Sequence, residues 1–142
     1  MSHSDELLGE VETLRRLRRH RADRAERALR EAKRAQQALL AHIQQAQDTL
    51  EQTQLEEAQQ SARLLNQHQG QVLSLRDLKA WGSQERGLSA NTRRGIGDLE
   101  VLRGQQAEKQ ARVGSAQKQA TECLRQVEKL QELSLLLVQE SV

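Results

Sequence analysis

Apolar residues in the second half of the chain recur at alternating steps of three and four residues. Such steps return to one face of an α-helix, and a face of this length needs a partner helix. Twelve of the eighteen positions are apolar, whereas a chain that is 36% hydrophobic would place about six or seven there by chance. We call this contact face the seam. Its positions are Leu78, Trp81, Glu85, Leu88, Thr92, Gly95, Leu99, Leu102, Gln106, Lys109, Val113, Ala116, Ala120, Cys123, Val127, Leu130, Ser134 and Leu137.

The first half shows the same spacing over its middle part, and its ends fall in shifted frames. The regular part consists of Ala22, Ala25, Leu29, Ala32, Gln36, Leu39, Ile43, Ala46 and Leu50. At the start, Leu7, Val11 and Leu14 precede an extra four-residue step. At the end, Leu55, Ala58, Ala62 and Leu65 follow another such step. Extra steps of this kind locally unwind a supercoil, so we expect the apolar face to shift at both ends of this helix.

Turn signals lie between the two periodic halves. Gly70 suits the left-handed position after a helix, and Ser74-Leu-Arg-Asp77 resembles a capping box at the start of the next. We predict helices of equal length over 5–69 and 75–139, joined by a turn at 70–74. The fold is then a single all-α domain, a long antiparallel two-helix coiled-coil hairpin in which residue i faces about 144 minus i. Leu14 is expected to meet Leu130.

A rival turn lies in the glycine-containing segment 82–91. Glycines at 82, 87, 95 and 97 each weaken a helix by about 1 kcal/mol. A turn there leaves the first thirty or so residues without a partner helix. We therefore expect 82–97 to be a soft or broken part of the second helix.

The composition fits a coiled coil better than a globule. Trp81 is the only aromatic residue, there is no proline, and 30% of the residues are charged. A two-helix hairpin buries a thin core, so we expect self-association or a partner to add stability.

The sequence also predicts a cytoplasmic protein. The first residues lack the pattern of a signal peptide, and the longest apolar run, 135–138, is far too short to span a bilayer. Cys123 is the only cysteine, which fits a reducing compartment, and it falls on the predicted seam as a small core residue.

Signals for catalysis or cofactor binding are missing from the sequence. His3, His20, His42 and His68 stand at no metal-binding or catalytic spacing, and no glycine-rich phosphate loop follows a strand. A two-helix hairpin also offers no enclosed pocket for its carboxylates. We expect neither enzymatic activity nor a metal or cofactor.

The strongest local feature is a basic stretch at 15–34. It carries a net charge of +7 from ten basic and three acidic residues, while the rest of the chain carries −5. The basic residues are Arg15, Arg16, Arg18, Arg19, Arg21, Arg24, Arg27, Arg30, Lys33 and Arg34.

Three interpretations of this stretch are open. It is a docking surface for an acidic protein, or a solvated helix face supported by pairs such as Glu26–Arg30, or a surface that follows nucleic-acid phosphates. Neither a DNA-binding motif nor interleaved aromatic residues support the last. Trp81 is a second candidate contact, because a two-helix hairpin can hardly cover an indole.

The whole chain resembles the FliJ/YscO-type stalk proteins of bacterial type III secretion systems, and among them the HrpO proteins of plant-associated bacteria. The segments that carry the resemblance are Leu14-Arg-Arg-Leu-Arg-Arg19, Arg24-Ala-Glu-Arg-Ala-Leu29 and Val72-Leu-Ser-Leu-Arg-Asp-Leu-Lys-Ala-Trp81, within a two-helix plan of matching size.

This resemblance implies a cytoplasmic stalk, peripheral to the inner-membrane machinery. Such a stalk sits in the central hole of a hexameric secretion ATPase, links it to the export gate, and contacts the ATPase regulator and export chaperones. In that family the end that bears the two termini points into the ATPase ring, which would bring residues 15–34 near the pore. The alternatives are a generic bacterial coiled-coil adaptor or tether and a nucleic-acid-binding rod.

Overall fold

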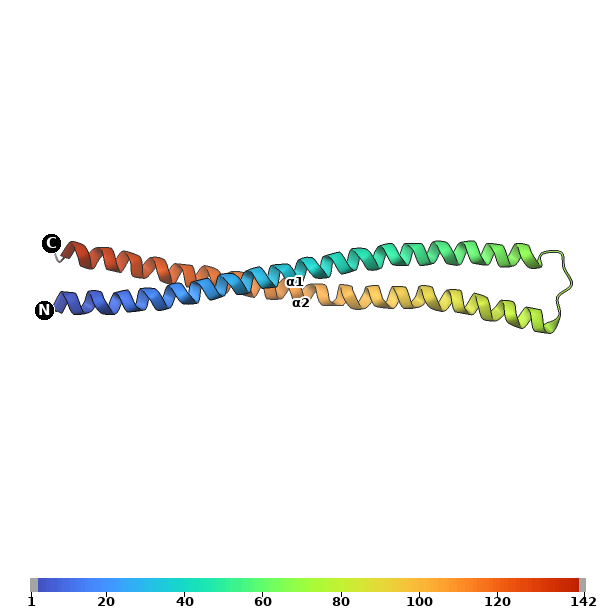
Figure 1. Ribbon diagram of the computed structural model, residues 1–142, viewed down its shortest axis with the longest axis horizontal. Coiled ribbons are helices and arrows are strands. Elements are labelled where there is room, and N and C mark those ends of the chain that lie inside the picture. The colour runs from blue at the N-terminus through green and yellow to red at the C-terminus, as the bar shows by residue number, and fades with distance from the viewer. Residues whose placement is uncertain (1–2, 141–142) are drawn as a thin grey trace. The chain divides into compact units, whose positions relative to one another are not determined.

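The structure is a computed structural model that describes residues 3–140. It contains two long helices, α1 (His3–His68) and α2 (Leu75–Glu140), packed antiparallel as a hairpin. The predicted fold class, an all-α two-helix hairpin, is confirmed (Figure 1).

Residues 69–74 connect the helices, and local hydrogen bonds fix both helix ends. We expected helices over 5–69 and 75–139; the start of α2 agrees, and the other three bounds differ by one or two residues, as helix ends commonly do. Gly70 has φ +74°, a conformation that glycine adopts without strain, and the Gln71 amide donates to the His68 carbonyl at 3.3 Å. Ser74 caps α2, because its Oγ accepts from the Asp77 amide at 3.1 Å.

The hairpin divides into two compact units. The terminal unit holds the chain up to Gln37 together with the chain from Glu108 on, and the turn unit holds Ala38–Ala107. Each unit therefore consists of one segment of α1 and one segment of α2, and each has its own core.

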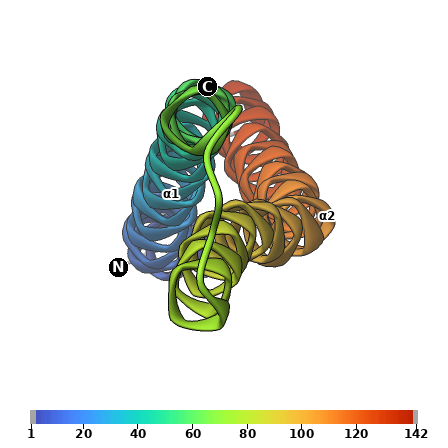
Figure 2. The ribbon, with the colours of Figure 1, turned by 90° about the vertical axis from the view of Figure 1, so that its right-hand side faces the viewer.

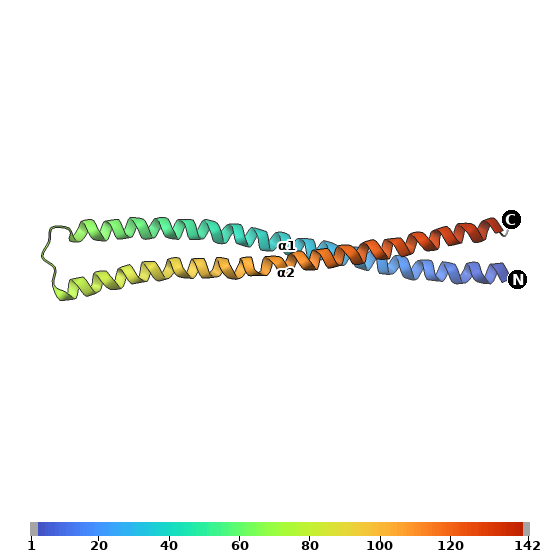
Figure 3. The same cartoon turned by 180° about the vertical axis from the view of Figure 1, so that it is seen from behind.

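The core of the terminal unit is built from small and medium-sized side chains. Ala25, Leu29 and Ala120 form a buried cluster, and the partly buried side chains packed on it are Val113, Ala116 and Cys123. Cys123 is thus a seam residue, as predicted. The two helix segments of this unit cross in the views of Figures 1 and 3, as helices that wind around each other do.

The core of the turn unit is apolar at a distance from the loop. Leu39, Ile43 and Leu99 form its buried cluster, and the partly buried side chains packed on it are Ala46, Leu50 and Leu102. Figure 2 looks onto the loop that joins α1 to α2 in this unit.

Burial follows the predicted seam closely in α2 and in the middle of α1. Of the eighteen positions predicted in α2, sixteen are buried or partly buried, and only Leu78 and Gln106 are exposed. All nine positions predicted from Ala22 to Leu50 in α1 are buried or partly buried. The 3-4 spacing therefore identified the contact face of both helices.

The frame shift expected near the start of α1 is wrong. Leu7 and Leu14 are 38% and 43% exposed. The buried or partly buried positions there are Leu8, Val11, Arg15 and Arg18, which continue the spacing of Ala22 without a break. Because α2 keeps its own unbroken spacing through the terminal unit, a shift in α1 alone would turn its apolar face away from the partner.

The shift expected at the end of α1 occurs, but the residues predicted for the shifted frame are wrong. Leu55, Ala58, Ala62 and Leu65 are all exposed. The seam instead passes through Thr53, Glu57, Ser61, Leu64 and His68, and it contains one extra four-residue step between Glu57 and Ser61.

Polar side chains in this part of the seam bond across it. Thr92 donates a hydrogen bond to Glu57, and Ser61 Oγ donates to Glu85 Oε2 at 2.7 Å. Glu85 Oε1 also accepts from Trp81 Nε1 at 3.3 Å. Hydrogen bonds therefore supplement the apolar contacts of Leu64, Trp81 and Leu88 in the seam near the loop.

The glycine-containing segment 82–97 is helical throughout, so the structure has no break there. Its lower local stability stays a prediction. The glycines differ in what surrounds them: a Cβ on Gly87 would meet nothing within 4 Å, whereas a Cβ on Gly95 would lie 3.1 Å from Leu50 Cδ1.

We predict that alanine at Gly87 and alanine at Gly95 change the free energy of unfolding differently. Gly87→Ala should raise the free energy of unfolding by about 0.5–1 kcal/mol, because alanine favours a helix over glycine. Gly95→Ala should gain less or lose stability, because its methyl group crowds Leu50. Urea unfolding followed by circular dichroism measures both. An equal gain at the two sites would contradict the close seam at Gly95.

Candidate partner-binding surface

The basic stretch lies on α1 in the terminal unit, and its side chains point to all sides of the helix. Arg15 and Arg18 stand on the seam, and both are partly buried. The other eight basic residues are exposed: Arg16, Arg19, Arg21, Arg24, Arg27, Arg30, Lys33 and Arg34.

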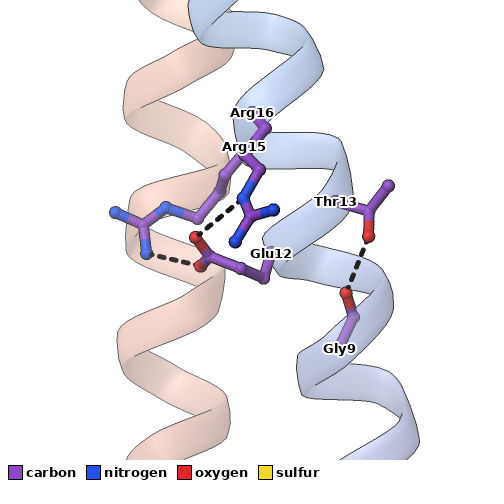
Figure 4. Close-up of polar contacts among 5 residues, drawn as sticks. All are labelled: Gly9, Glu12, Thr13, Arg15 and Arg16. Atoms are coloured by element: carbon purple, nitrogen blue, oxygen red, sulfur yellow. Dashed lines mark hydrogen bonds and ion pairs between the residues drawn. The ribbon is translucent and has the colours of Figure 1, made fainter.

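Among residues 3–140, ion pairing engages only the first turn of this stretch. Arg15 Nη1 lies 3.3 Å from Glu12 Oε2, and Arg16 Nε lies 4.0 Å from Glu12 Oε1. Figure 4 shows the two guanidinium groups sharing this carboxylate, beside the hydrogen bond from Thr13 to the Gly9 carbonyl. The shared Glu12 carboxylate is exposed, so the pairs stabilise the helix little.

Arg18 uses its charge differently. Its Nη1 donates to the Gln126 main-chain carbonyl of α2 at 3.1 Å, which crosses the seam. Arg18 thus occupies a regular seam position.

Seven exposed basic residues of the stretch carry no ion pair within the described part of the chain. The pair Glu26–Arg30, which would have supported a plain solvated face, is not formed there. The seven are Arg19, Arg21, Arg24, Arg27, Arg30, Lys33 and Arg34.

The partner segment of α2 does not neutralise this charge. Residues 108–140 contain five acidic and five basic residues, so their net charge is zero. Their two ion pairs, Arg112–Glu108 and Arg125–Glu122, lie within α2 itself. The terminal unit therefore presents the positive charge of residues 15–34 to its surroundings.

A shallow groove runs along one side of the seam in the terminal unit. It holds about 250 Å³ and brings Arg18 and Arg21 together with residues of α2. The α2 residues that line it are Gln119, Glu122, Cys123 and Gln126. Within residues 3–140, no three His, Cys, Asp or Glu side chains come together as metal ligands would.

Trp81 lies in the turn unit and is half-buried. Its indole stacks on the His68 imidazole, with ring centroids 5.0 Å apart, and donates to Glu85. The protein thus covers more of Trp81 than its thin core suggested. Its role in partner contact stays a prediction.

Comparison with known proteins identifies the family. The model of the type III secretion protein YscO family matches residues 11–141. The chain belongs to the YscO family.

Structural comparison agrees with this assignment. The 2.8 Å crystal structure of the type III secretion protein YscO from Vibrio parahaemolyticus aligns with a TM-score of 0.88 over 97% of this chain and 87% of that chain. The two sequences are 16% identical, so this match shows that the two proteins share a fold. No curated protein matches the sequence. Within residues 3–140 of this YscO-family chain, neither helix is long and apolar enough to cross a membrane.

Sequence reasoning found the basic residues of this YscO-family chain but not their surroundings. It missed that Arg15 stands on the seam and that Glu57 and Glu85 bond across it. Continuing the spacing backward from Ala22 leads to Arg18 and Arg15, so the signal was present. The polar character of these positions concealed it.

We predict that Arg18→Leu stabilises the protein. Leucine at a seam position buries more apolar surface than an arginine, and the single hydrogen bond to the Gln126 carbonyl offsets only part of that gain. The free energy of unfolding should rise by about 1 kcal/mol. Arg21→Leu is the matched control and should change it little, because Arg21 is exposed. A lower melting temperature for Arg18→Leu would show that the hydrogen bond dominates.

Proposed function

We propose that this YscO-family protein is the non-enzymatic central stalk of a type III secretion apparatus. Its terminal unit binds the hexameric secretion ATPase on the cytoplasmic side of the inner membrane. Its turn unit links the ATPase to the export gate. The ATPase regulator and export chaperones are further partners in this proposal.

One observation carries the ATPase contact. Seven exposed basic side chains without an ion pair stand on α1 opposite a segment of α2 whose net charge is zero. A ring or collar rich in carboxylates fits this surface, because long-range attraction speeds the encounter and fixes its orientation.

The turn unit supports the gate contact by its apolar surface near the loop. Val72 is fully exposed, and Leu75 and Leu78 are 69% and 53% exposed. Exposed apolar side chains gathered around one loop are typical of a protein contact. Half-buried Trp81 stands on the same part of α2.

The ATPase contact is tested by charge reversal in the basic stretch. Wild-type protein should bind the purified hexameric ATPase and raise its hydrolysis rate. The triple variant Arg19→Glu, Arg27→Glu, Arg30→Glu should lose this stimulation, because its three exposed cations become anions. Its helical signal should stay, since exposed charges contribute little to folding. Stimulation by the wild type should weaken as salt rises above about 0.15 M.

The matched control reverses three exposed arginines outside the stretch: Arg63→Glu, Arg93→Glu and Arg103→Glu. This variant has the same net charge as the first and should stimulate like the wild type. Equal stimulation by both variants would remove the basic stretch from the mechanism. A wild-type protein that binds no secretion ATPase would contradict the stalk and leave the adaptor interpretation. Tight, salt-sensitive binding to any DNA duplex would favour the nucleic-acid interpretation.

A further inference from the structure

The two flanks of the seam in the terminal unit differ in composition. The seam occupies heptad positions a and d, with Leu8, Arg15 and Ala22 at a and Val11 and Arg18 at d. In an antiparallel pair, position g of one helix borders position g of the other, and position c lies just outside it. We call this side the g flank and the opposite side, with positions e and b, the e flank.

Leucines from both helices meet on the g flank toward the end where α1 begins. The α1 residues are Leu7, Leu14 and Leu17, and the α2 residues are Leu133 and Leu136. Their exposed fractions run from 38% at Leu7 to 58% at Leu136. Five exposed leucines on one side of a helix pair form an apolar patch, not scattered surface residues.

The groove described above continues this patch. It places Arg21 between Gln119 and Gln126 of α2. One heptad nearer the start of α1, the same arrangement places Leu14 between Gln126 and Leu133. A second groove along the same flank is lined by Arg21, Arg24, Ala25, Ala28, Gln119 and Cys123. The g flank is thus apolar at one end, and at the other it carries Arg21 and Arg24 together with the acidic Glu122.

The e flank lacks this combination. Its apolar residues, Leu124, Leu135 and Val138, come from α2 alone. The α1 side of the same flank carries charged residues, among them Glu12, Arg16 and Arg19, and Glu12 pairs with Arg16. A partner helix on the e flank would meet leucines on one side only.

We propose that the g flank of the terminal unit binds a third helix, an amphipathic helix of a partner protein with acidic residues along one edge. Its apolar stripe covers Leu7, Leu14 and Leu133, and its carboxylates face Arg21 and Arg24. The stretch from Leu7 to Arg24 measures about 26 Å, or about five helical turns.

Charge complementarity selects this occupant over a second copy of the chain. Arg21 and Arg24 have no ion pair in the described structure, so they are available to a partner. Two copies laid parallel on this flank would oppose their own arginines. Two copies laid antiparallel would cover the leucines and leave the arginines unmatched.

A fluorescent synthetic peptide provides the test and needs no ATPase. The peptide is a helix of about 21 residues with leucine at positions a and d and glutamate along its edges, and its control replaces each glutamate with lysine. Fluorescence anisotropy measures the affinity of the full-length protein for each. The acidic peptide should bind at least about tenfold more tightly than the lysine peptide.

Two g-flank variants have matched e-flank controls. Leu14→Gln with Leu133→Gln removes the apolar half, and its control is Leu124→Gln with Leu135→Gln, whose leucines are similarly exposed. Arg21→Glu with Arg24→Glu removes the basic half, and its control is Arg19→Glu with Lys33→Glu, both exposed. Each g-flank variant should weaken acidic-peptide binding by about tenfold or more and each control by less than about twofold.

Several outcomes would overturn this proposal. One is no binding of the acidic peptide to the wild type, and another is equal binding of the acidic and lysine peptides. Equal losses in the e-flank controls would do the same. The last outcome is measured by analytical ultracentrifugation of the chain alone. A stable wild-type dimer that is lost in the variant Leu14→Gln with Leu133→Gln would assign the g flank to a second copy. Peptide binding and ATPase stimulation are separate measurements, so either proposal can fail without the other.

Discussion

Two paired helices can bury only the face that each turns to the other, and the remaining features of this protein depend on that limit. Even the most buried apolar side chain, Leu130, keeps 4% of its surface exposed, and alanines supply several of the buried positions. Such layers bury little area, so the seam alone supplies modest stability. The same limit leaves most of each helix open to solvent, where the basic stretch and the exposed leucines are available to partners.

Several polar residues at seam positions have hydrogen-bond partners. Arg18 donates to a main-chain carbonyl of the opposite helix, and Glu57 and Glu85 accept hydrogen bonds from across the seam. Among the described residues, no buried side-chain nitrogen or oxygen lacks a partner. A thin seam tolerates these groups because solvent stays close, so desolvation costs less than it does in a globular core. They reduce the apolar contact that holds the helices together, which increases the advantage of binding a further helix.

The fold was predictable because apolar residues recur periodically along the seam. The exact seam positions were not predictable where polar residues occupy them. From Trp81 to Leu137, apolar residues mark most turns of α2, and the structure buries the same face. Leu14 and Leu55 led to the wrong frames in α1, because an apolar residue one step off the seam looks like a shifted frame. Partial burial of Arg15 depends on α2, which keeps α1 in phase, and this is a tertiary effect. Which basic residues stay unpaired also depended on side-chain geometry, which periodicity does not contain.

Disulfide trapping with the native cysteine tests the seam most directly. Cys123 and Ala22 both stand on the seam of the terminal unit, and one seam step from the Arg18–Gln126 hydrogen bond, four residues along α1 and three back along α2, places them in one layer. Ala22→Cys should therefore form an intramolecular disulfide with Cys123 under mild oxidation, seen as a faster-migrating monomer without reductant. Leu50→Cys should not, because Leu50 packs against Gly95. A hairpin that turned within 82–91 would instead pair position 50 with Cys123, so a disulfide in Leu50→Cys and none in Ala22→Cys would contradict the seam described here.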